Sequence, residues 1–333
     1  MNKTYLVSGC SGFIGSHFLE YLLDKTDAHI ISVNSWQHKG TPERIVEVLK
    51  GREDRVTVMT HDLTTPFTDV TLKRFPKIDY IINFASDSHV DRSIKEPSPF
   101  IQNNVNLTLT MLELARKVKP EVFVQISTDE VYGSAPDGVR FKEWSEILPS
   151  NPYAASKAAQ EAICISYWRT YGVPVVITNT VNNFGERQDT EKYLARLIKL
   201  IDKGETVTVH GTPEYNGGRF YLHAKNHASA VKHIIDNKLA VSYEDGVNKR
   251  PTRFNVTSDD EISNIDMAHL IAEIMGKELK YEYTDYHATR NGHDRRYGLD
   301  GSKLKETGWE LEFPLRPSLD EYISWTLAHQ HWL

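Results

Sequence analysis

The sequence contains little cysteine: Cys10 and Cys164 are the only two among 333 residues. Two cysteines cannot form a disulfide framework or a cysteine-rich metal cluster, and none of the fourteen histidines lies in an HExxH pattern. We therefore expect no metal site. A reducing cytoplasm is the simplest compartment for such a chain.

The sequence also lacks an excess of positive charge and long apolar runs. It has 39 Lys and Arg residues against 45 Asp and Glu residues, a formal net charge of −6, which argues against nucleic acid as a partner. No apolar run approaches the roughly eighteen residues of a membrane span. Strand-forming residues follow Met1 almost at once, without the pattern of a secretory or transit segment. We expect a soluble chain that binds no membrane and is long enough for a substantial core with a smaller lobe.

Glycine is placed where a nucleotide-binding turn needs it. The segment Thr4–Ser8 has strand-forming residues, and Gly9, Gly12 and Gly15 lead from it into an amphipathic helix. Gly9 can take the tight turn, Gly12 allows the backbone to approach a pyrophosphate, and Gly15 permits close packing of helix on sheet. We predict a dinucleotide site formed by Gly9, Gly12, Phe13, Ile14 and Gly15.

The end of the second predicted strand, His29–Val33, bears on the choice of cofactor. Asn34 stands near the place where an acidic residue normally holds the adenosine ribose of NAD. Asparagine can accept one hydrogen bond there, but it does not repel the 2′-phosphate of NADP. The next three residues include no arginine for that phosphate, although His38 and Lys39 are close, so we favour NAD over NADP. The other predicted cofactor contacts are Asp62, Leu63, Tyr153 and Lys157.

Segments typical of strands and helices alternate along the first half of the chain. We expect strands near 55–60, 78–84, 121–127 and 173–179, and helices near 65–75, 97–118, 151–171 and 190–204. This alternation predicts an α/β fold with a doubly wound parallel (Rossmann) sheet. After about residue 180 the rhythm changes, with a short strand near Phe254–Val256 and a helix from about Asn264 to Ile274, which indicates a smaller C-terminal substrate-binding lobe. We assign 1–179 plus about 219–256 to the NAD-binding domain, and 180–218 plus 257–333 to the lobe.

Two adjacent carboxylates follow a strongly strand-forming run. The run Val122–Ile126 leads into Ser127, Thr128, Asp129 and Glu130. Because neighbouring side chains of a strand point to opposite faces, the two carboxylates can act on one substrate only where the chain leaves the pleat. We therefore place them at the carboxyl end of the strand, where open α/β sheets bind ligands and unlike surroundings can make one an acid and the other a base. The alternative is a polar, solvated turn.

A tyrosine and a lysine share one face of the helix predicted near 151–171. Tyr153 and Lys157 stand at positions i and i+4, Asn151 suits the N-cap, and Pro152 suits the first helical position. The phenol then lies near the positive end of the helix dipole, with an ammonium one turn away. We expect both effects to lower the pKa of Tyr153 towards the range of a base.

Together these motifs resemble the extended short-chain dehydrogenase/reductases, most closely the dTDP-glucose 4,6-dehydratases. The resemblance covers nearly the whole chain. The triplet Thr128-Asp129-Glu130 is its most specific part, because related epimerases and decarboxylases have other residues at one or both carboxylate positions. Further matching segments are 88–94, 149–153, 182–185, 191–192 and 290–297.

The resemblance implies an NAD-dependent dehydration in which a 4-keto-6-deoxy sugar nucleotide is formed. Tyr153, assisted by Lys157 and Thr128, would remove the proton of the sugar C4 hydroxyl while hydride leaves C4. Glu130 would then take the C5 proton, Asp129 would protonate the departing C6 hydroxyl, and hydride would return to C6. To act as an acid near neutral pH, Asp129 needs a raised pKa, for which burial and the charge of Glu130 are the available causes.

The resemblance also implies contacts to the sugar, diphosphate and base of a nucleotide-diphosphate sugar. The residues that it assigns are Ser88, His89, Asn182, Glu191, Lys192, Arg219, Asn255, Arg290 and His293. Two segments depart from the family pattern. Residues 219–223 read Arg-Phe-Tyr-Leu-His in place of Arg-Asp-Trp-Leu-Tyr, and residues 186–190 replace a more apolar, proline-containing stretch. The base is therefore open between thymidine and uridine.

Two other functions compete with the dehydratase. One is a sugar-nucleotide epimerase or decarboxylase of the same superfamily, which the adjacent Asp129 and Glu130 disfavour. The other is a non-catalytic cofactor sensor, which would be free to lose Tyr153 or Lys157. In the resembling family, helices corresponding to 97–118 and 151–171 pair across a homodimer as a four-helix bundle. Apolar residues on more than one side of these helices fit either that dimer or burial within the subunit.

Overall fold

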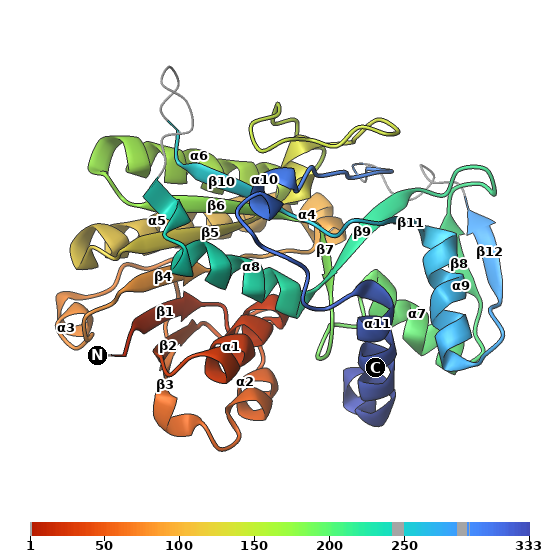
Figure 1. Cartoon of the computed structure of the whole chain (residues 1–333), viewed down its shortest axis with the longest axis horizontal. Helices are drawn as coiled ribbons and strands as arrows, with labels where there is room; N and C mark the ends of the chain where they lie inside the picture. The colour runs from red at the N-terminus through yellow and green to blue at the C-terminus, as the bar shows by residue number, and fades with distance from the viewer. Residues whose placement is uncertain (1, 242–249, 285–291, 293) are drawn as a thin grey trace.

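A seven-stranded parallel sheet forms the centre of the protein, which the computed structural model describes over residues 2–241, 250–284, 292 and 294–333 (Figure 1). The strand order is β10-β6-β5-β4-β1-β2-β3, so the order reverses between β1 and β4. Open α/β sheets bind ligands beyond the carboxyl ends of the strands at such a switch point. The strands are β1 (Thr4–Ser8), β2 (His29–Asn34), β3 (Val56–Thr60), β4 (Tyr80–Asn83), β5 (Val122–Thr128), β6 (Val175–Thr180) and β10 (Thr252–Val256). The predicted fold class is confirmed.

Helices cover both faces of this sheet because its strands are apolar on both sides. Leu6 packs with α5 and α6, whereas its neighbour Val7 packs with α1 and α8. On the first face lie α4 (Val90–Lys95), α5 (Pro97–Val118) and α6 (Pro152–Tyr171); on the second lie α1 (Phe13–Lys25), α2 (Pro42–Leu49) and α8 (Ala224–Asp236). The short helices α3 (Asp69–Leu72) and α10 (Ser302–Lys305) lie at the ends of the sheet region.

A smaller lobe lies beside the sheet, on the right in Figure 1, and has its own apolar core. Its strands are β7 (Asn182–Phe184), β9 (Gly218–His223) and β11 (Glu261–Ser263) in one sheet, and β8 (Val207–His210) and β12 (Tyr281–Thr284) in another. Its helices are α7 (Tyr193–Asp202), α9 (Asn264–Met275) and α11 (Leu315–Ala328). Leu194, Ile198, Met267, Ile271 and Leu319 pack together between them.

The structure corrects two details of the sequence prediction. The helix expected near 65–75 is reduced to α3, because Pro66 and Pro76 bracket the segment and prevent a longer helix. The segment 219–256, assigned as a whole to the NAD-binding domain, is divided: β10 pairs with β6 in the large sheet, but β9 pairs with β7 and β11 in the lobe.

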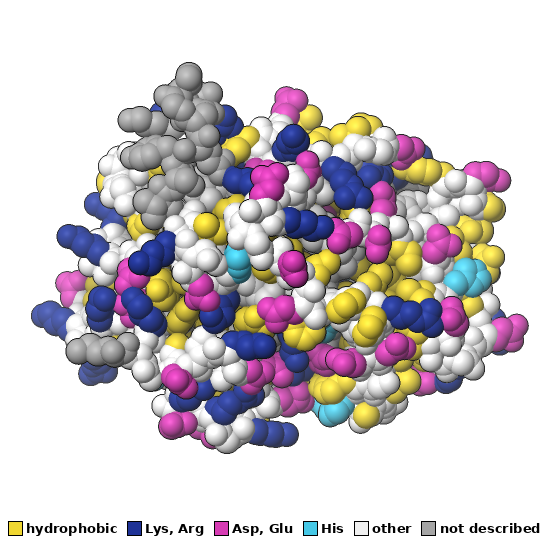
Figure 2. All heavy atoms as spheres, viewed as in Figure 1, with side chains coloured by type: hydrophobic (Ala, Val, Ile, Leu, Met, Phe, Trp, Pro, Cys, Tyr) yellow, Lys and Arg dark blue, Asp and Glu magenta, His cyan; other side chains and the backbone are white. Residues whose placement is uncertain are grey.

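The molecular surface carries charges of both signs. Lys and Arg side chains are interspersed with Asp and Glu over the face shown in Figure 2, in keeping with the formal net charge of −6. Within the described residues, no helix has both the length and the apolar character needed to cross a membrane.

Candidate active site

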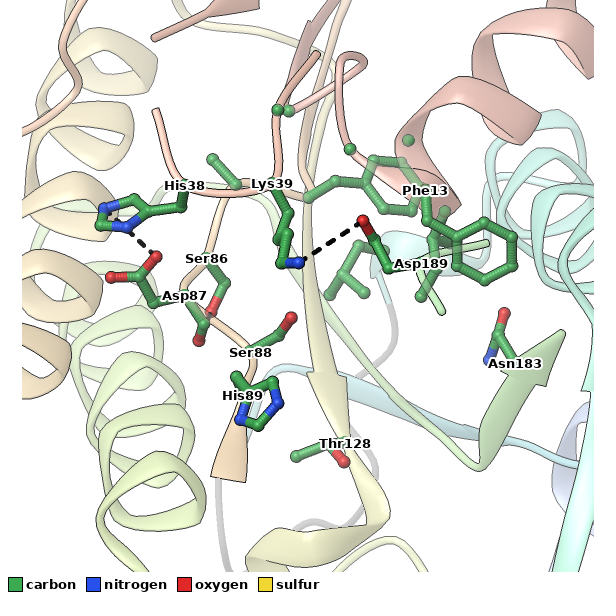
Figure 3. A pocket seen from close by; sticks show the side chains of 18 of the residues that line it. Phe13, His38, Lys39, Ser86, Asp87, Ser88, His89, Thr128, Asn183 and Asp189 are labelled. Carbon is green, nitrogen blue, oxygen red and sulfur yellow. Dashed lines mark hydrogen bonds and ion pairs between the residues drawn. The ribbon is translucent and has the colours of Figure 1, made fainter. Parts of the chain in front are cut away.

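A cavity of about 420 Å³ lies at the carboxyl ends of the central strands, where the sheet meets the lobe (Figure 3). It brings together most of the residues predicted from the sequence. Those that line it are Gly9, Gly12, Phe13, Ile14, Gly15, Asn34, Asp62, Leu63, Ser88, His89, Thr128, Glu130, Tyr153, Lys157, Asn182, Glu191 and Lys192. Asp129, Arg219 and Asn255 are described by the structure but do not line the cavity. Arg290 and His293 lie outside the described residues.

The glycine turn between β1 and α1 has no room for side chains. Gly9 has a positive φ of +77°, and a Cβ atom there would lie 2.9 Å from the backbone nitrogen of Ala85. A Cβ atom on Gly15 would lie 2.1 Å from the carbonyl oxygen of Gly9, so any larger residue would push α1 away from the turn. The turn therefore presents backbone at the amino end of α1, which suits a pyrophosphate.

Asn34 holds the glycine turn against β2. Its Oδ1 accepts the backbone N–H of Ser11 at 2.8 Å, and its Nδ2 donates to Ser32 Oγ at 2.8 Å. The side chain is only 2% exposed, and these bonds direct its amide into the protein. The contact to the adenosine ribose that was predicted for Asn34 stays a prediction.

The carboxylate pair lies where β5 ends and a 3-10 turn, η2 (Asp129–Tyr132), begins. Thr128 Oγ1 donates to Asp129 Oδ1 at 3.0 Å and accepts the backbone N–H of Glu130 at 3.3 Å, so Thr128 caps the turn. The chain thus leaves the pleat between Thr128 and Asp129, as predicted. Glu130 lines the cavity, whereas Asp129 is 3% exposed and is not among the lining residues.

The two carboxylates are held in different environments. Burial and the neighbouring charge of Glu130 raise the pKa of Asp129 to about 7, against a hydrogen bond from Thr128. Burial also raises the pKa of Glu130, while donors from Asn151 and Tyr297 oppose the change. Asn151 Nδ2 and Tyr297 Oη lie 3.2 and 3.3 Å from Glu130 Oε2. Asp129 can therefore keep a proton near neutral pH.

Tyr153 stands at the start of α6, where Asn151 Oδ1 accepts the backbone N–H of Ala154 at 2.9 Å and caps the helix as predicted. The predicted lowering of the Tyr153 pKa is wrong. Burial and the charges of Glu130 and Asp129 raise the pKa of the phenol well above its ordinary range, and a contact with Thr128 opposes this only in part. Helix position alone could not reveal two carboxylates brought in from β5.

Lys157 lies one turn further along α6 and is 4% exposed. Its Nζ donates to the carbonyl oxygen of Ile126 at 2.7 Å. Burial lowers the pKa of Lys157 to about 8, and the charge of Glu161 opposes that shift. The ammonium is thus fixed against the end of β5, at the edge of the cavity.

Two basic residues that follow β2 pair with carboxylates of the segment between β7 and α7. Lys39 Nζ lies 3.0 Å from Glu191 and 4.0 Å from Asp189, and the side chains of Lys39 and Asp189 face each other in Figure 3. Arg44, which is fully buried, pairs with Asp189 at 3.0 Å and donates to the carbonyl oxygen of Ser11 at 3.3 Å. These ion pairs connect the glycine turn to the segment between β7 and α7.

The expected substrate residues of the cavity also interact with one another. His89 Nε2 lies 3.5 Å from Glu191 Oε2, and Lys192 Nζ donates to the carbonyl oxygen of Ser88 at 3.3 Å. Figure 3 shows Ser88 and His89 beside Thr128. These contacts therefore connect the segment that follows β4 to the segment that precedes α7, and both segments line the cavity.

Asn255 does not have the position expected for a substrate contact. It is fully buried in β10, and its Nδ2 donates to the carbonyl oxygens of Phe141 at 2.9 Å and Asp300 at 3.1 Å. The resemblance matched its position in the sequence, but long-range packing turns the amide into the core.

Arg219 lies outside the cavity lining but close to the carboxylate pair. Its Nη2 donates to the carbonyl oxygen of Asp294 at 2.6 Å, and its guanidinium stacks over the ring of Tyr297 at 4.6 Å. Its positive charge lowers the pKa of Asp129 and of Glu130 against the effect of burial. Arg219 thus stabilises the ionised forms of Asp129 and Glu130 without lining the cavity.

Sequence reasoning missed the role of Tyr297, whose hydroxyl reaches Glu130 from far along the chain. The tyrosine belongs to a segment that matched the family, but that match did not single it out. Tyr221, Gln188 and Lys39 also line the cavity without having been predicted. They come from segments that meet only after the lobe has packed on the sheet.

Among the described residues, His17, Glu186 and His223 form a cluster whose candidate ligand atoms all lie within 4.8 Å of one another. Glu186 Oε2 lies 3.1 Å from His17 Nε2 and 3.5 Å from His223 Nε2. The backbone N–H of Lys225 donates to His223 Nδ1 at 3.3 Å, so a neutral His223 carries its proton on Nε2. That proton leaves no lone pair for a metal, and the cluster is a hydrogen-bonded link between α1 and the lobe.

Comparison with known proteins places this geometry in a family. A model of the GDP-mannose 4,6 dehydratase family matches residues 6–321. A low-salt glycan biosynthesis protein of Haloferax volcanii is 33% identical over 97% of this chain and 98% of its own. A dTDP-glucose 4,6-dehydratase of Escherichia coli is 31% identical over 98% of this chain and 94% of its own.

Solved structures agree with the sequence comparison. The dTDP-glucose 4,6-dehydratase of Streptomyces venezuelae, crystallised with NAD bound, has a TM-score of 0.84 and 30% identity over 99% of this chain and 98% of its own. The enzyme of the same name from Bacillus anthracis, in complex with NAD, has a TM-score of 0.84 and 28% identity over 99% of this chain and 98% of its own.

Proposed function

The chain belongs to the GDP-mannose 4,6-dehydratase family, and from this premise we propose that it is an NAD-dependent nucleotide-sugar 4,6-dehydratase. The enzyme is a hydro-lyase that converts a nucleotide-diphosphate glucose into the 4-keto-6-deoxy sugar nucleotide and water. The observation that carries the proposal is the meeting of Asp129 and Glu130, at the end of β5, with Tyr153 and Lys157 beside one cavity. Neither an epimerase nor a decarboxylase needs both carboxylates.

The residues at the glycine turn fit a dinucleotide, because Gly9, Gly12 and Gly15 line the cavity and Cβ atoms on Gly9 and Gly15 would collide with the backbone that forms the turn. NAD, when bound, supplies the acceptor and later the donor of one hydride. Two contacts support NAD over NADP: His38 lies 3.4 Å from Asp87, and Lys39 lies 3.0 Å from Glu191. Both basic residues near the end of β2 are paired with carboxylates, which repel a 2′-phosphate.

Tyr153 removes the proton of the sugar C4 hydroxyl in the first step. Its raised pKa makes the phenolate a strong base once it has formed, and the Thr128 hydroxyl stabilises the negative charge. We assign the same part to the protonated Lys157, which stands one helical turn away. Because Tyr153 and Lys157 share one face of α6, both groups point to the same side of the cavity.

Glu130 and Asp129 divide the elimination between them. Oxidation at C4 makes the C5 hydrogen acidic, and Glu130, which faces the cavity, takes that proton. Asp129, whose pKa is about 7, gives its proton to the departing C6 hydroxyl. The charge of Glu130 is one cause of the raised pKa of Asp129, so the two roles support each other.

Ser88, His89, Asn182, Glu191 and Lys192 contact the sugar and diphosphate, and Arg219 acts near the reacting carboxylates. Lys192 and His89 are suited to a diphosphate by their charge or their donor groups. The roles of Arg290 and His293 stay predictions from the sequence. The unusual segments 186–190 and 219–223 leave the base open between thymidine and uridine.

The test is to incubate the protein with dTDP-glucose and UDP-glucose and to look for a 4-keto-6-deoxy product. With deuterium at C4 of the substrate, the label should appear at C6 of the same molecule, since the hydride is stored in one closed site. Solvent hydrogen at C6 would contradict the mechanism. Inversion at C4 without loss of water would identify an epimerase, and no reaction with any nucleotide sugar would favour a cofactor sensor.

The quaternary state is proposed to be a homodimer through α5 and α6, which pack side by side. Leu112 and Leu114 are buried within the subunit, but Leu109 and Ile101 are each 41% exposed on α5, and Trp168 is partly exposed on α6. A four-helix bundle would cover these side chains. Light scattering at micromolar concentration decides, because a clean 38.1 kDa monomer contradicts the dimer. A cytoplasmic location is proposed with it, since both cysteines are free.

A further inference from the structure

Glu161 is a carboxylate in the interior of the protein, two helical turns beyond Tyr153. Tyr153, Lys157 and Glu161 stand at i, i+4 and i+8 on α6, so they form one stripe along the helix. Glu161 is fully buried and does not line the cavity. Burying a carboxylate is costly unless it is paired and hydrogen-bonded, so the contacts of Glu161 indicate what it does.

Two contacts join Glu161 to the strand end that carries the catalytic carboxylates. Ser127 Oγ donates to Glu161 Oε1 at 2.5 Å, and Asn179 Nδ2 donates to the same oxygen at 2.7 Å. Asn179 Nδ2 also donates to the carbonyl oxygen of Thr128 at 3.0 Å. Glu161 therefore binds the two residues that directly precede Asp129, one through a side chain and the other through Asn179.

A third contact balances the charge. Arg253 Nη2 on β10 donates to Glu161 Oε2 at 2.7 Å, and neither side chain is exposed. Arg253 is itself fixed, since its Nη1 donates to the carbonyl oxygen of Glu143 at 2.9 Å and its guanidinium stacks over Trp144 at 4.2 Å. Removing one partner of such a pair leaves the other as an uncompensated buried charge.

Glu161 also provides the negative charge that acts on Lys157. Burial lowers the pKa of Lys157, while Glu161 first and Cys164 second raise it. The ammonium donates to the carbonyl oxygen of Ile126 on β5, and Glu161 is itself paired with Arg253 on β10. Glu161 thus interacts with both the ammonium and the guanidinium.

We propose that Glu161 is a positioning residue, which fixes the spacing between the end of β5 and the tyrosine-lysine face of α6 and places its carboxylate one helical turn from Lys157. The two halves of the active site come from these two elements, and Glu161 bonds to one while standing on the other. This inference depends on the proposed function only for the role of Lys157 in the reaction. Cofactor binding reports on Lys157 without any sugar, because Lys157 lines the cavity with the glycine turn.

The experiment measures NAD affinity and the rate of cofactor reduction against pH in the full-length protein. Wild-type NAD affinity should fall as Lys157 loses its proton near pH 8. In Glu161→Gln the midpoint of that fall should move to lower pH by about two units, the order expected for one charge at helical i,i+4 separation in an interior of effective dielectric about 20. In Arg253→Met the carboxylate is uncompensated, so the midpoint should move to higher pH. Arg253→Lys and Glu143→Gln are controls that should keep the wild-type midpoint, the latter because Glu143 is a buried carboxylate away from Lys157.

The opposite direction of the two shifts is the decisive result, since mere structural damage would move both variants alike or neither. Shifts of the same sign, or an unmoved midpoint in Glu161→Gln with only a lower melting temperature, would overturn the proposal, as would a wild-type affinity without an alkaline fall. If Arg253→Met does not fold, Glu161→Asp decides: it should restore the midpoint that Glu161→Gln loses. The two proposals can fail separately. If the midpoints shift as expected but the protein reduces no cofactor with any nucleotide sugar, the proposed function is rejected and the role of Glu161 stands.

Discussion

The two ends of the cavity are built by different means. The cofactor end is centred on the segment Gly9–Gly15, where a Cβ atom on Gly9 or Gly15 would collide with backbone. The catalytic end is formed by side chains from β5, α6 and the lobe, which meet through long-range packing. The cofactor end therefore depends mainly on backbone conformation, and the catalytic end depends on burial of side chains from distant segments. Substitutions at the two ends should consequently fail in different ways.

Tyr153→Phe should separate the two ends most. It removes the base from the catalytic end but leaves the glycine turn intact, so cofactor reduction and product formation should fall by about 10²-fold to 10⁴-fold. NAD affinity should change by less than about threefold, a difference below 1 kcal/mol. Single-turnover absorbance of the reduced cofactor and calorimetric NAD binding measure the two quantities. Retention of more than a few per cent of activity, about 10⁻² of wild type, would reject Tyr153 as the base.

The carboxylate pair allows the catalytic end itself to be divided. Asp129→Asn should still oxidise C4 and exchange the C5 hydrogen with solvent, but lose water about 10²-fold more slowly, because the acid is missing. Glu130→Gln should lose the C5 exchange as well. Deuterium exchange followed by mass spectrometry distinguishes the variants. Equal exchange in both would contradict the separate roles.

At the cofactor end, Gly15→Ala should weaken NAD binding by tens of times. The new Cβ atom would lie 2.1 Å from the carbonyl oxygen of Gly9, so α1 must shift, at a cost of about 1 to 3 kcal/mol in the free energy of unfolding. Gly51→Ala is the control, since Gly51 has a positive φ but nothing within 4 Å of its added Cβ atom. That variant should lose some stability and keep its NAD affinity. An unchanged affinity in Gly15→Ala would mean that the turn does not hold the pyrophosphate.

The proton on Asp129 should make stability depend on pH at the catalytic end. The folded protein holds this proton up to about pH 7, whereas the unfolded chain releases it near the ordinary value of 3.8. Between these values the folded state binds more protons, so raising the pH through this window lowers the free energy of unfolding, and above pH 7 the contribution is constant. Asp129→Asn should lose less melting temperature across the window than the wild type. Gly51→Ala should keep the wild-type pH dependence, and an identical dependence in Asp129→Asn would place that proton elsewhere.

Asn34→Asp should have the smallest effect. A carboxylate still accepts the N–H of Ser11 but no longer donates to Ser32, and its charge repels a 2′-phosphate. The ratio of NAD to NADP affinity should rise a few-fold, as measured by competition binding. An unchanged ratio would mean that Asn34 does not face the ribose.

The same contrast explains what could be predicted from the sequence. The strands of the large sheet and the N-cap of α6 depend mainly on residues close together in the sequence. The pattern of strand-forming residues indicated the strands correctly, and Asn151 indicated the cap. The direction of the Tyr153 pKa shift could not be obtained in that way, because it depends on burial and on Glu130 and Asp129, which stand in η2, more than twenty residues earlier in the chain.

The residues assigned by resemblance alone did not all lie at the cavity, and long-range packing is again the reason. A matching position fixes where a residue stands in the chain, but not which way its side chain points. Asn255 occupies the expected place in β10 and is nevertheless bonded inside the core. Tyr297, which touches Glu130, could have been found only by knowing that its segment packs against η2.

The ion pairs that Lys39 and Arg44 make with Asp189 and Glu191 have a kinetic consequence. They join the segment after β2 to the segment between β7 and α7, and Lys39, Asp189 and Glu191 line the cavity, so we expect release of NAD to require that the Lys39 pairs separate. Lys39 is half exposed, so mobile ions can screen its pairs, whereas Arg44 is fully buried and its pair is largely protected. Rising ionic strength should therefore weaken the Lys39 ion pairs and speed the exchange of bound cofactor. The size of the increase reports how much these pairs contribute to the barrier to exchange. A reaction that ends with its cofactor reoxidised has no need of that exchange, so turnover should be much less sensitive to salt than the residence time of NAD.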